Sequence, residues 1–227
     1  MTGMDWQAIA LSVELAAIVC GALMVLGLPL AYWLTFSRRR WKFLVESVVA
    51  LPLVLPPTVL GFYVLVAIGA RSPIGQAWTS WLGHGLAFSF EGLVIASILY
   101  SLPFAVQPLA AAFSQVDPAL IEASSILGAS GARTFARVVL PLSVNGVLTG
   151  AILSFAHTIG EFGVVVMVGG NRPGVTRTVS IAIYDEVQAF DYATANATAF
   201  LLVCFSFIVL AAVYGLNRRV WAVAPQP

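Results

Sequence analysis

Charged residues are scarce in this sequence, which has 11 Lys and Arg and 10 Asp and Glu among 227 residues, or 9%. Soluble domains carry about 25% charged residues. Hydrophobic residues make up 60% of the chain, and the mean hydropathy is +0.95. A soluble domain could not bury that much apolar surface, so we expect lipid to be the solvent for most of the chain. The net charge of +1 gives no indication of a nucleic-acid partner, and none is expected.

Cysteine and histidine are also rare, with two residues of each. Cys20 and Cys204 lie in long apolar runs, where we expect small buried side chains and neither a disulfide nor a metal site. The first ten residues contain Asp5 but no Lys or Arg. This composition disfavours a cleaved signal peptide and predicts that the first apolar run is retained as a membrane span.

Five apolar stretches are long enough to cross a bilayer, which requires about 20 residues. They cover residues 6–36, 43–70, 92–116, 142–170 and 192–216. The sequence therefore predicts an all-α integral membrane protein with five transmembrane helices in a single domain, residues 1–227. The segment LPLVLPP in the second stretch predicts a broken or sharply kinked helix, either a structural kink or a hinge beside a pathway.

The positions of the basic residues predict the orientation of the spans, because cytoplasmic connections are enriched in Lys and Arg. The residues assigned to the cytoplasmic side are Arg38, Arg39, Arg40, Lys42, Arg133, Arg137, Arg218 and Arg219. The opposite side has only Arg71, Arg172 and Arg177. We therefore expect the N-terminus outside, the C-terminus in the cytoplasm and the 117–141 connection in the cytoplasm.

The 117–141 connection has the pattern of a helix, a turn and a second helix. Asp117 followed by Pro118 favours a helix start. Gly128 and Gly131 favour a tight turn with positive φ, after which Arg133 and Arg137 are spaced to share one helical face. A solvated connector would explain the segment, but it would leave apolar side chains in water unless they docked on a partner. These side chains are Ile121, Ile126, Leu127 and Phe135.

The same connection resembles the EAA loop of ABC importer permeases. The matching residues are Glu122, Ala123, Gly128, Leu140 and Pro141. The sequence departs from the pattern at Ser124, where the family has Ala, and at Val138, nine residues after Gly128, where the family has Ile. The resemblance implies a type I ABC importer permease whose coupling helices dock on a separate ATPase. Gly128 would then allow close approach of the partner, and Glu122 would pair with a cation or cap a helix there.

A nucleotide-binding loop of the form G-x-x-x-x-G-K-[ST] is missing from the sequence. The glycine-containing segment GASGAR lacks the lysine and follows no expected strand. We therefore expect no cofactor in this chain and no catalytic residue, with ATP and Mg²⁺ bound by the partner ATPase. The assembled complex, and not this chain alone, would hydrolyse ATP.

A second motif lies in the fourth apolar stretch, where Gly160, Glu161, Phe162 and Gly163 form the sequence GEFG. This motif resembles permeases for tetrahedral oxyanions, and the molybdate type most closely. Sulfate/thiosulfate and tungstate permeases of the same family remain alternatives. The family usually has Arg four residues before the glutamate, where this sequence has His157.

In a continuous helix, Gly150, Ser154, His157 and Glu161 would share one face, with Glu161 toward the outer leaflet. A carboxylate repels an oxyanion, so Glu161 is expected to close a gate by pairing with His157 or with backbone donors. A purely structural pair is the alternative. Candidate polar groups lining the path are Thr58, Asn145, Thr149 and Ser154.

The family resemblance also implies partners. These are a second copy of the chain in a homodimer, two cytoplasmic ABC ATPase subunits, and an extracytoplasmic oxyanion-binding protein docking near Arg172 and Arg177. The expected location is the bacterial inner membrane, with the lipid bilayer around the spans. From other classes, a secondary transporter or channel remains an alternative. An intramembrane enzyme is disfavoured because no nucleophile and base lie at a usable spacing.

Overall fold

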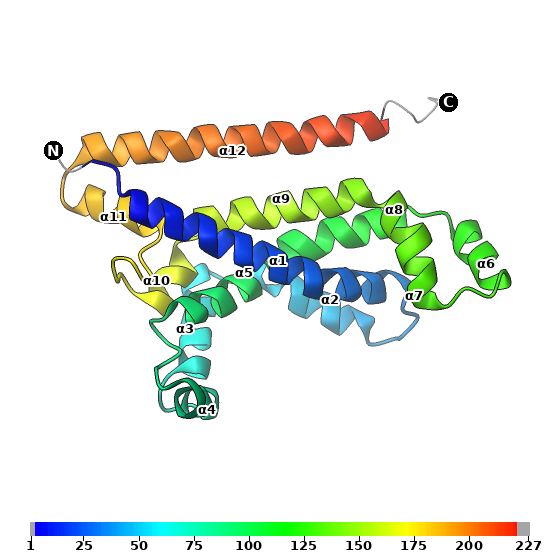
Figure 1. The fold of residues 1–227 in the computed structure, drawn as a ribbon, viewed down its shortest axis with the longest axis horizontal. Helices are drawn as coiled ribbons and strands as arrows, with labels where there is room; N and C mark the ends of the chain where they lie inside the picture. The colour runs from blue at the N-terminus through cyan, green and yellow to red at the C-terminus, as the bar shows by residue number, and fades with distance from the viewer. Residues whose placement is uncertain (1–2, 222–227) are drawn as a thin grey trace.

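The computed structural model describes residues 3–221, with the side chains of residues 3–215. Regular secondary structure in these residues is helical throughout, which confirms the all-α prediction. Four long helices run roughly side by side along the longest axis (Figure 1). They are α1 (Trp6–Phe36), α5 (Phe90–Ser114), α9 (Val144–Gly160) and α12 (Tyr192–Trp221).

Helix α1 begins where the apolar run begins, because Asp5 caps it: the Asp5 carboxylate accepts a hydrogen bond from the Ala8 amide at 3.0 Å. The helix continues through Pro29, and α5 likewise continues through Pro103 and Pro108. Proline within these two helices therefore removes backbone donors without ending the helix, as membrane proteins tolerate where neighbours cover the site.

The second apolar stretch is broken, as the sequence predicted. It forms α2 (Lys42–Ala50), a 3₁₀ turn η1 (Leu51–Leu53) and α3 (Pro57–Ile68), with a bend of 111° between the two halves. Pro56 is extended, with ψ of 134°, and Pro57 is the first residue of α3. Proline suits the first helical position because its missing N–H would be unpaired there in any case.

The prediction of one continuous helix over 142–170 is wrong. Helix α9 ends at Gly160, and Glu161 is extended with φ −69° and ψ 131°. A separate helix, α10 (Gly163–Gly169), follows Phe162. Uniform apolarity hides such a break, since hydropathy alone does not distinguish one span from two half-helices.

Short helices cover the connections. The 117–141 connection contains α6 (Pro118–Ile126), α7 (Gly131–Thr134) and a π-helical turn η2 (Phe135–Val139), followed by α8 (Leu140–Leu142). Toward the opposite end lie α4 (Pro73–Leu82) and α11 (Val179–Gln188). A bend of 78° separates the helices of Gly131–Leu142 from α9.

The core lies where α1, α5, α9 and α10 pack together. Leu15, Val19 and Leu23 of α1 are fully buried against Leu93 of α5 and Val165 of α10. Small residues bring α9 close to α5: a Cβ on Gly146 would lie 2.1 Å from the Ala112 Cβ, and one on Gly150 would lie 3.0 Å from the Ala105 carbonyl oxygen. Close contact at small residues is the usual way in which membrane helices associate, since lipid gives no hydrophobic driving force between them.

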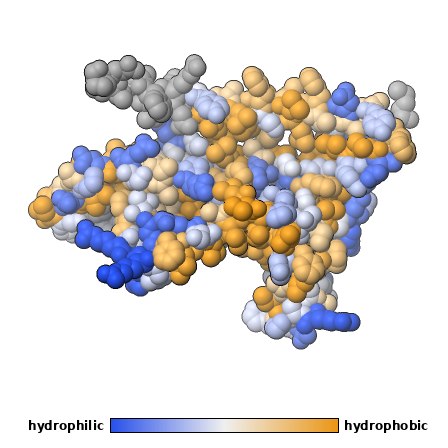
Figure 2. All heavy atoms as spheres, turned by 180° about the vertical axis from the view of Figure 1, so that it is seen from behind, coloured by the Kyte–Doolittle hydropathy of each residue, from blue (hydrophilic) through white to orange (hydrophobic). Residues whose placement is uncertain are grey.

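Three helices in the described residues are long and apolar enough to span a membrane, or up to five spans if each bent pair counts as one. Figure 2 shows hydrophobic surface over much of one face, with the most hydrophilic atoms toward its edges. Helix α12 is the most exposed of the three, because only 11% of its 18-residue apolar segment is buried inside the protein. The orientation across the membrane stays a prediction, and the side chains of Arg218 and Arg219 lie outside those described.

The α5–α9 contact predicts different outcomes for two glycine-to-alanine substitutions. Gly146→Ala forces its new methyl group against Ala112 and should cost about 1–3 kcal/mol through overpacking. Gly21→Ala in α1 meets no atom within 4 Å and should be neutral or stabilising by up to about 1 kcal/mol. Thermal unfolding midpoints of the two variants in detergent test this. Equal shifts in the midpoint would contradict the close approach at Gly146.

Candidate functional site

The elbow, which we define as residues 117–142, turns sharply between α6 and α7. The Asp117 carboxylate accepts from the Ala119 amide at 2.9 Å and caps α6. Gly128 has a φ of +76°, so the predicted left-handed glycine is confirmed there. The prediction is wrong for Gly131, which starts α7 with Ser130 as its cap.

Two adjacent apolar side chains form the tip of the elbow. Ile126 and Leu127 are each 86% exposed. The predicted exposure of Ile121 and Phe135 is wrong, because both pack against the core cluster that contains Phe113. The rings of Phe135 and Phe113 meet edge to face, with centroids 5.8 Å apart. The elbow is therefore anchored at its base, and its tip presents apolar surface.

A hydrogen bond clamps the two arms of the elbow. The Ser124 and Thr134 hydroxyl oxygens lie 2.8 Å apart, and Thr134 is 3% exposed. Ser124 is one of the two positions at which this sequence departs from the family pattern, and here the departure supplies a polar contact that alanine could not make. Of the other residues predicted to form the coupling loop, Leu140 is half-buried. The exposed ones are Glu122, Ala123, Gly128, Arg133, Arg137 and Pro141.

The predicted regular helix through Arg133 and Arg137 is wrong in its spacing. The π-helical turn η2 spans Phe135–Val139, with the Leu140 amide bonded to the Phe135 carbonyl. A π turn places one more residue in the turn than an α-helix does, so Arg133 and Arg137 do not keep the regular i, i+4 relation.

The junction, which we define as the break between α9 and α10, opens onto a cavity of about 480 Å³. Its wall combines the GEFG motif with residues from α3 and α5. The lining residues are Pro57, Thr58, Tyr100, Ala156, His157, Gly160, Glu161, Phe162 and Gly163. The structure thus brings Thr58, His157 and the GEFG residues together at one cavity.

His157 is held by α5 and not by Glu161. Its Nδ1 atom lies 2.9 Å from the Ser101 hydroxyl oxygen. The imidazole stacks on Phe104, with centroids 3.8 Å apart and planes 22° apart, and Tyr100 lies beside it at 4.9 Å. No ion pair within 4.0 Å joins His157 to Glu161 in the described part of the chain, so the predicted gate pair is wrong. The end of α9 at Gly160 removes Glu161 from the helical face on which the pairing depended.

Glu161 is 3% exposed, and both carboxylate oxygens are buried without a hydrogen-bond partner among the described residues. Ser97 of α5 interacts with the carboxylate, although its hydroxyl also forms no hydrogen bond of standard geometry. A buried carboxyl group without donors is costly to keep ionised. Glu161 is therefore part of the protein interior at the junction and does not offer a charge to the cavity.

Ser154 does not line a path. It is fully buried and donates to the Ala151 carbonyl at 3.1 Å. Gly150, one turn before it, faces Ala105 of α5. The α9 face predicted as pathway lining is instead the packing face against α5.

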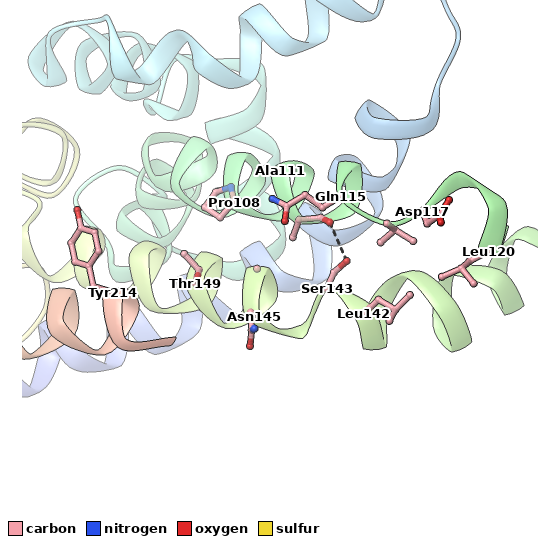
Figure 3. A pocket seen from close by; sticks show the side chains of 13 residues that line it. Pro108, Ala111, Gln115, Asp117, Leu120, Leu142, Ser143, Asn145, Thr149 and Tyr214 are labelled. Carbon is pink, nitrogen blue, oxygen red and sulfur yellow. Dashed lines mark hydrogen bonds between the residues drawn. The ribbon is translucent and has the colours of Figure 1, made fainter. Parts of the chain in front are cut away.

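A second cavity, of about 800 Å³, lies between the ends of α5, α9 and α12 next to the elbow (Figure 3). Asn145 and Thr149 line it, and Thr149 has a buried hydroxyl without a partner among the described residues. Ser143 donates across it to the Ala112 carbonyl at 3.4 Å. The predicted lining residues therefore divide between two cavities, with Thr58 at the junction and Asn145 and Thr149 beside the elbow.

At the end opposite the elbow, Arg177 joins two segments. Its guanidinium lies 3.4 Å from the Asp5 carboxylate and 3.3 Å from that of Asp185. Burial raises the pKa of Glu186 in the same cluster, and nearby Asp191 adds to the rise. Arg172 donates to the Phe88 carbonyl at 2.7 Å. Both arginines thus hold loops together, and Arg177 is engaged on two sides.

Sequence reasoning missed the α5 side of the junction. Ser97, Ser101, Tyr100 and Phe104 carry no charge and lie in a stretch read only as a span. Ser97 and Ser101 are four residues apart in an apolar run, a spacing that places two hydroxyl groups on one face. The spacing of Ser97 and Ser101 was the feature of the sequence that could have identified the α5 side of the junction.

Comparisons with known proteins all point to components of transport systems. Residues 24–222 match the family described as "Binding-protein-dependent transport system inner membrane component". The "Molybdenum transport system permease protein ModB" of Azotobacter vinelandii is 53% identical over 94% of this chain and 95% of that protein. The protein of the same name from Escherichia coli (strain K12) is 37% identical over 83% of this chain and 82% of its own length.

A solved structure shares the fold. A chain of a bacterial ABC transporter involved in the import of the acidic polysaccharide alginate superimposes with a TM-score of 0.71 at 17% identity. The match covers 99% of this chain and 82% of that one. The helix arrangement described above is thus that of an ABC importer permease.

The hydrogen bond between Ser124 and Thr134 predicts that removing one of the two hydroxyl groups destabilises the elbow more than removing both. Ser124→Ala leaves the buried Thr134 hydroxyl unpaired, which costs about 1–3 kcal/mol, whereas Ser124→Ala with Thr134→Val removes both polar groups. Trypsin cleavage at Arg133 and Arg137 measures how often the elbow opens. We expect the single variant to be cut faster than the double variant. Identical cleavage rates for wild type and both variants would show that the clamp does not hold the elbow.

Proposed function

The chain belongs to the family of binding-protein-dependent transport system inner membrane components, and on this premise we propose that it is the molybdate-translocating subunit of an ATP-driven importer. It is a multi-pass protein of the inner membrane. The observation that carries the substrate is the 53% identity to a molybdenum transport permease over almost the whole of both chains. The GEFG motif at the junction cavity supports the same assignment, since the sequence motif and the cavity coincide.

The elbow is the proposed docking site for a separate ATPase. Ile126 and Leu127 expose apolar side chains at its tip, and Phe135 anchors its base in the core. An exposed apolar tip on a rigid base fits a groove on a partner, because burying it there removes it from water without further ordering. Arg133 and Arg137 are exposed nearby and are available to acidic groups of that partner. ATP and Mg²⁺ would be bound by the ATPase, which would supply the energy.

A homodimer is the proposed assembly. One copy of this chain has too few spans to surround a gated path. A two-fold axis would place two such cavities face to face. The exposed apolar residues of α3, which include Phe62, Tyr63 and Val66, would then contact either the second copy or lipid.

The end of the chain with α4 and α11 is the proposed face for an extracytoplasmic oxyanion-binding protein. Of the two arginines expected to contact it, Arg172 remains exposed, whereas Arg177 is occupied by Asp5 and Asp185. Arg172 is therefore the stronger candidate. Substitution of Arg177 would disturb the N-terminal cap region as well as any docking.

A secondary transporter or channel would have no use for the elbow. An ion-driven carrier works without an ATPase, so an apolar tip held out from the bundle would only be a liability in water. The elbow therefore favours an ATP-coupled importer.

Reconstitution tests the function directly. In proteoliposomes containing the chain with its partner ATPase and oxyanion-binding protein, we expect molybdate accumulation that requires ATP and resists excess sulfate. Accumulation that sulfate abolishes equally would assign the chain to the sulfate branch. Accumulation without the ATPase would overturn the importer assignment in favour of a secondary transporter.

If the ATPase docks at the elbow, substitutions at the elbow tip should weaken ATPase binding, whereas substitutions elsewhere should not. The pair Ile126→Ser and Leu127→Ser should weaken ATPase binding by about tenfold or more, since each tenfold corresponds to about 1.4 kcal/mol of lost contact. Ile74→Ser in α4, which removes an exposed apolar side chain far from the elbow (Figure 1), is the matched control. Co-purification of the ATPase reads the result. Retention of the ATPase by the double variant would move the docking site elsewhere.

A further inference from the structure

The junction contains a short chain of hydrogen bonds that runs from His157 into α9. His157 Nδ1 lies 2.9 Å from the Ser101 hydroxyl oxygen, which lies 3.0 Å from the Thr158 hydroxyl oxygen. The Thr158 hydroxyl lies 2.9 Å from the Ser154 carbonyl oxygen. Ser101, Ser154 and Thr158 are at most 2% exposed, so this chain is shielded from water.

The Ser154 carbonyl oxygen can only accept. With the single Thr158 hydroxyl hydrogen pointing to that oxygen, the directions of the other bonds follow. Thr158 can then only accept from Ser101, which uses the single hydrogen of the Ser101 hydroxyl. Ser101 is left to accept from the imidazole. His157 therefore carries a hydrogen on Nδ1, and the nitrogen free to gain or lose a proton is Nε2.

The Nε2 atom has no hydrogen-bond partner among the described residues, and His157 lines the junction cavity. Stacking on Phe104 holds the ring in one plane, and an aromatic face also stabilises a cation. Without a proton on Nε2 the ring is neutral, so it gives the cavity no charge that attracts an anion. With a proton on Nε2, it presents a cationic donor, which attracts one.

We propose that His157 Nε2 is a proton-linked contact for the tetrahedral dianion, taking up one proton from water as the dianion enters the junction cavity. The proposal rests on the proposed function and identifies the residue that meets the cargo. Linkage makes the effect reciprocal: if the dianion favours the protonated ring, a lower pH favours the dianion.

Of the groups around the ring, His157 is the one that can change its charge at the cavity. Both oxygens of Glu161 are buried and do not open onto it. Tyr100 of α5 lines the cavity with a neutral hydroxyl near pH 7. Thr58 of α3 adds a hydroxyl donor, and no Lys or Arg is among the lining residues. An entering dianion therefore meets neutral donors and one switchable nitrogen.

Nitrogen-15 NMR of the full chain in lipid nanodiscs tests the hydrogen-bond chain. The sequence has two histidines, so His84→Gln leaves His157 as the only labelled imidazole. We expect the Nδ1–H tautomer without anion, and a gain of a proton at Nε2 on addition of molybdate or sulfate but not chloride. Thr158→Val removes the acceptor for Ser101 and frees its hydrogen to point at Nδ1, so the tautomer should switch to Nε2–H. An Nε2–H tautomer in the chain with Thr158 intact, or a spectrum unchanged by both dianions, would overturn the proposal.

Uptake by the reconstituted complex supplies the second readout. With His157 present, the apparent affinity for molybdate should fall as pH rises, by up to about tenfold per pH unit, because one proton is taken up with the dianion. His157→Arg keeps a cation at every pH and should flatten the profile, while His84→Gln in the outer connection should leave it unchanged. A profile unaffected by His157→Arg would overturn the proton link. Failure of the proposed importer function would appear separately, as absence of ATP-dependent uptake beside a normal NMR response.

Discussion

A backbone amide or carbonyl group cannot remain unpaired in hydrocarbon, so a membrane protein can interrupt a helix only where other protein covers the interruption. This chain interrupts two spans, and the interruptions cover each other. The first turn of α3 lies against the first turn of α10: a Cβ on Gly163 would lie 2.7 Å from the Pro57 Cβ. One turn further, Gly61 meets Met167 just as closely. The junction cavity exists because these two breaks coincide.

Helix α9 joins the two functional regions. It begins directly after the elbow and ends at His157 and Gly160, and its 17 residues span about 25 Å. Glycine contacts hold it against α5 along its length, so it can move only with α5 or by sliding past it. A displacement imposed at the elbow therefore reaches the junction through one rigid element. This arrangement connects an ATPase on one side with an anion contact near the other.

Local chemistry made some features predictable from the sequence. Asp117 followed by Pro118 starts a helix through local contacts alone, and Pro56–Pro57 could not continue a helix. Gly128 needed a left-handed turn between two helix-forming segments. The wrong predictions concern residues whose burial or pairing is set by tertiary contacts. Ile121 and Phe135 found partners in the core, Arg177 found Asp5 far away in the sequence, and the end of α9 at Gly160 left no trace in hydropathy. Ser101 gained its significance only when α5 was placed beside His157.

The weak burial of α12 has a consequence for the bilayer itself. Its 24-residue apolar segment, Tyr192–Gly215, is about 36 Å long, which exceeds the roughly 30 Å of a typical hydrocarbon core. A helix packed on all sides would have to thicken the membrane around it. Because α12 is mostly exposed and packs against α11 and α9 on one side, it can accommodate the difference by tilting. Its inclination should therefore follow membrane thickness, while the bundle of α1, α5 and α9 keeps its geometry.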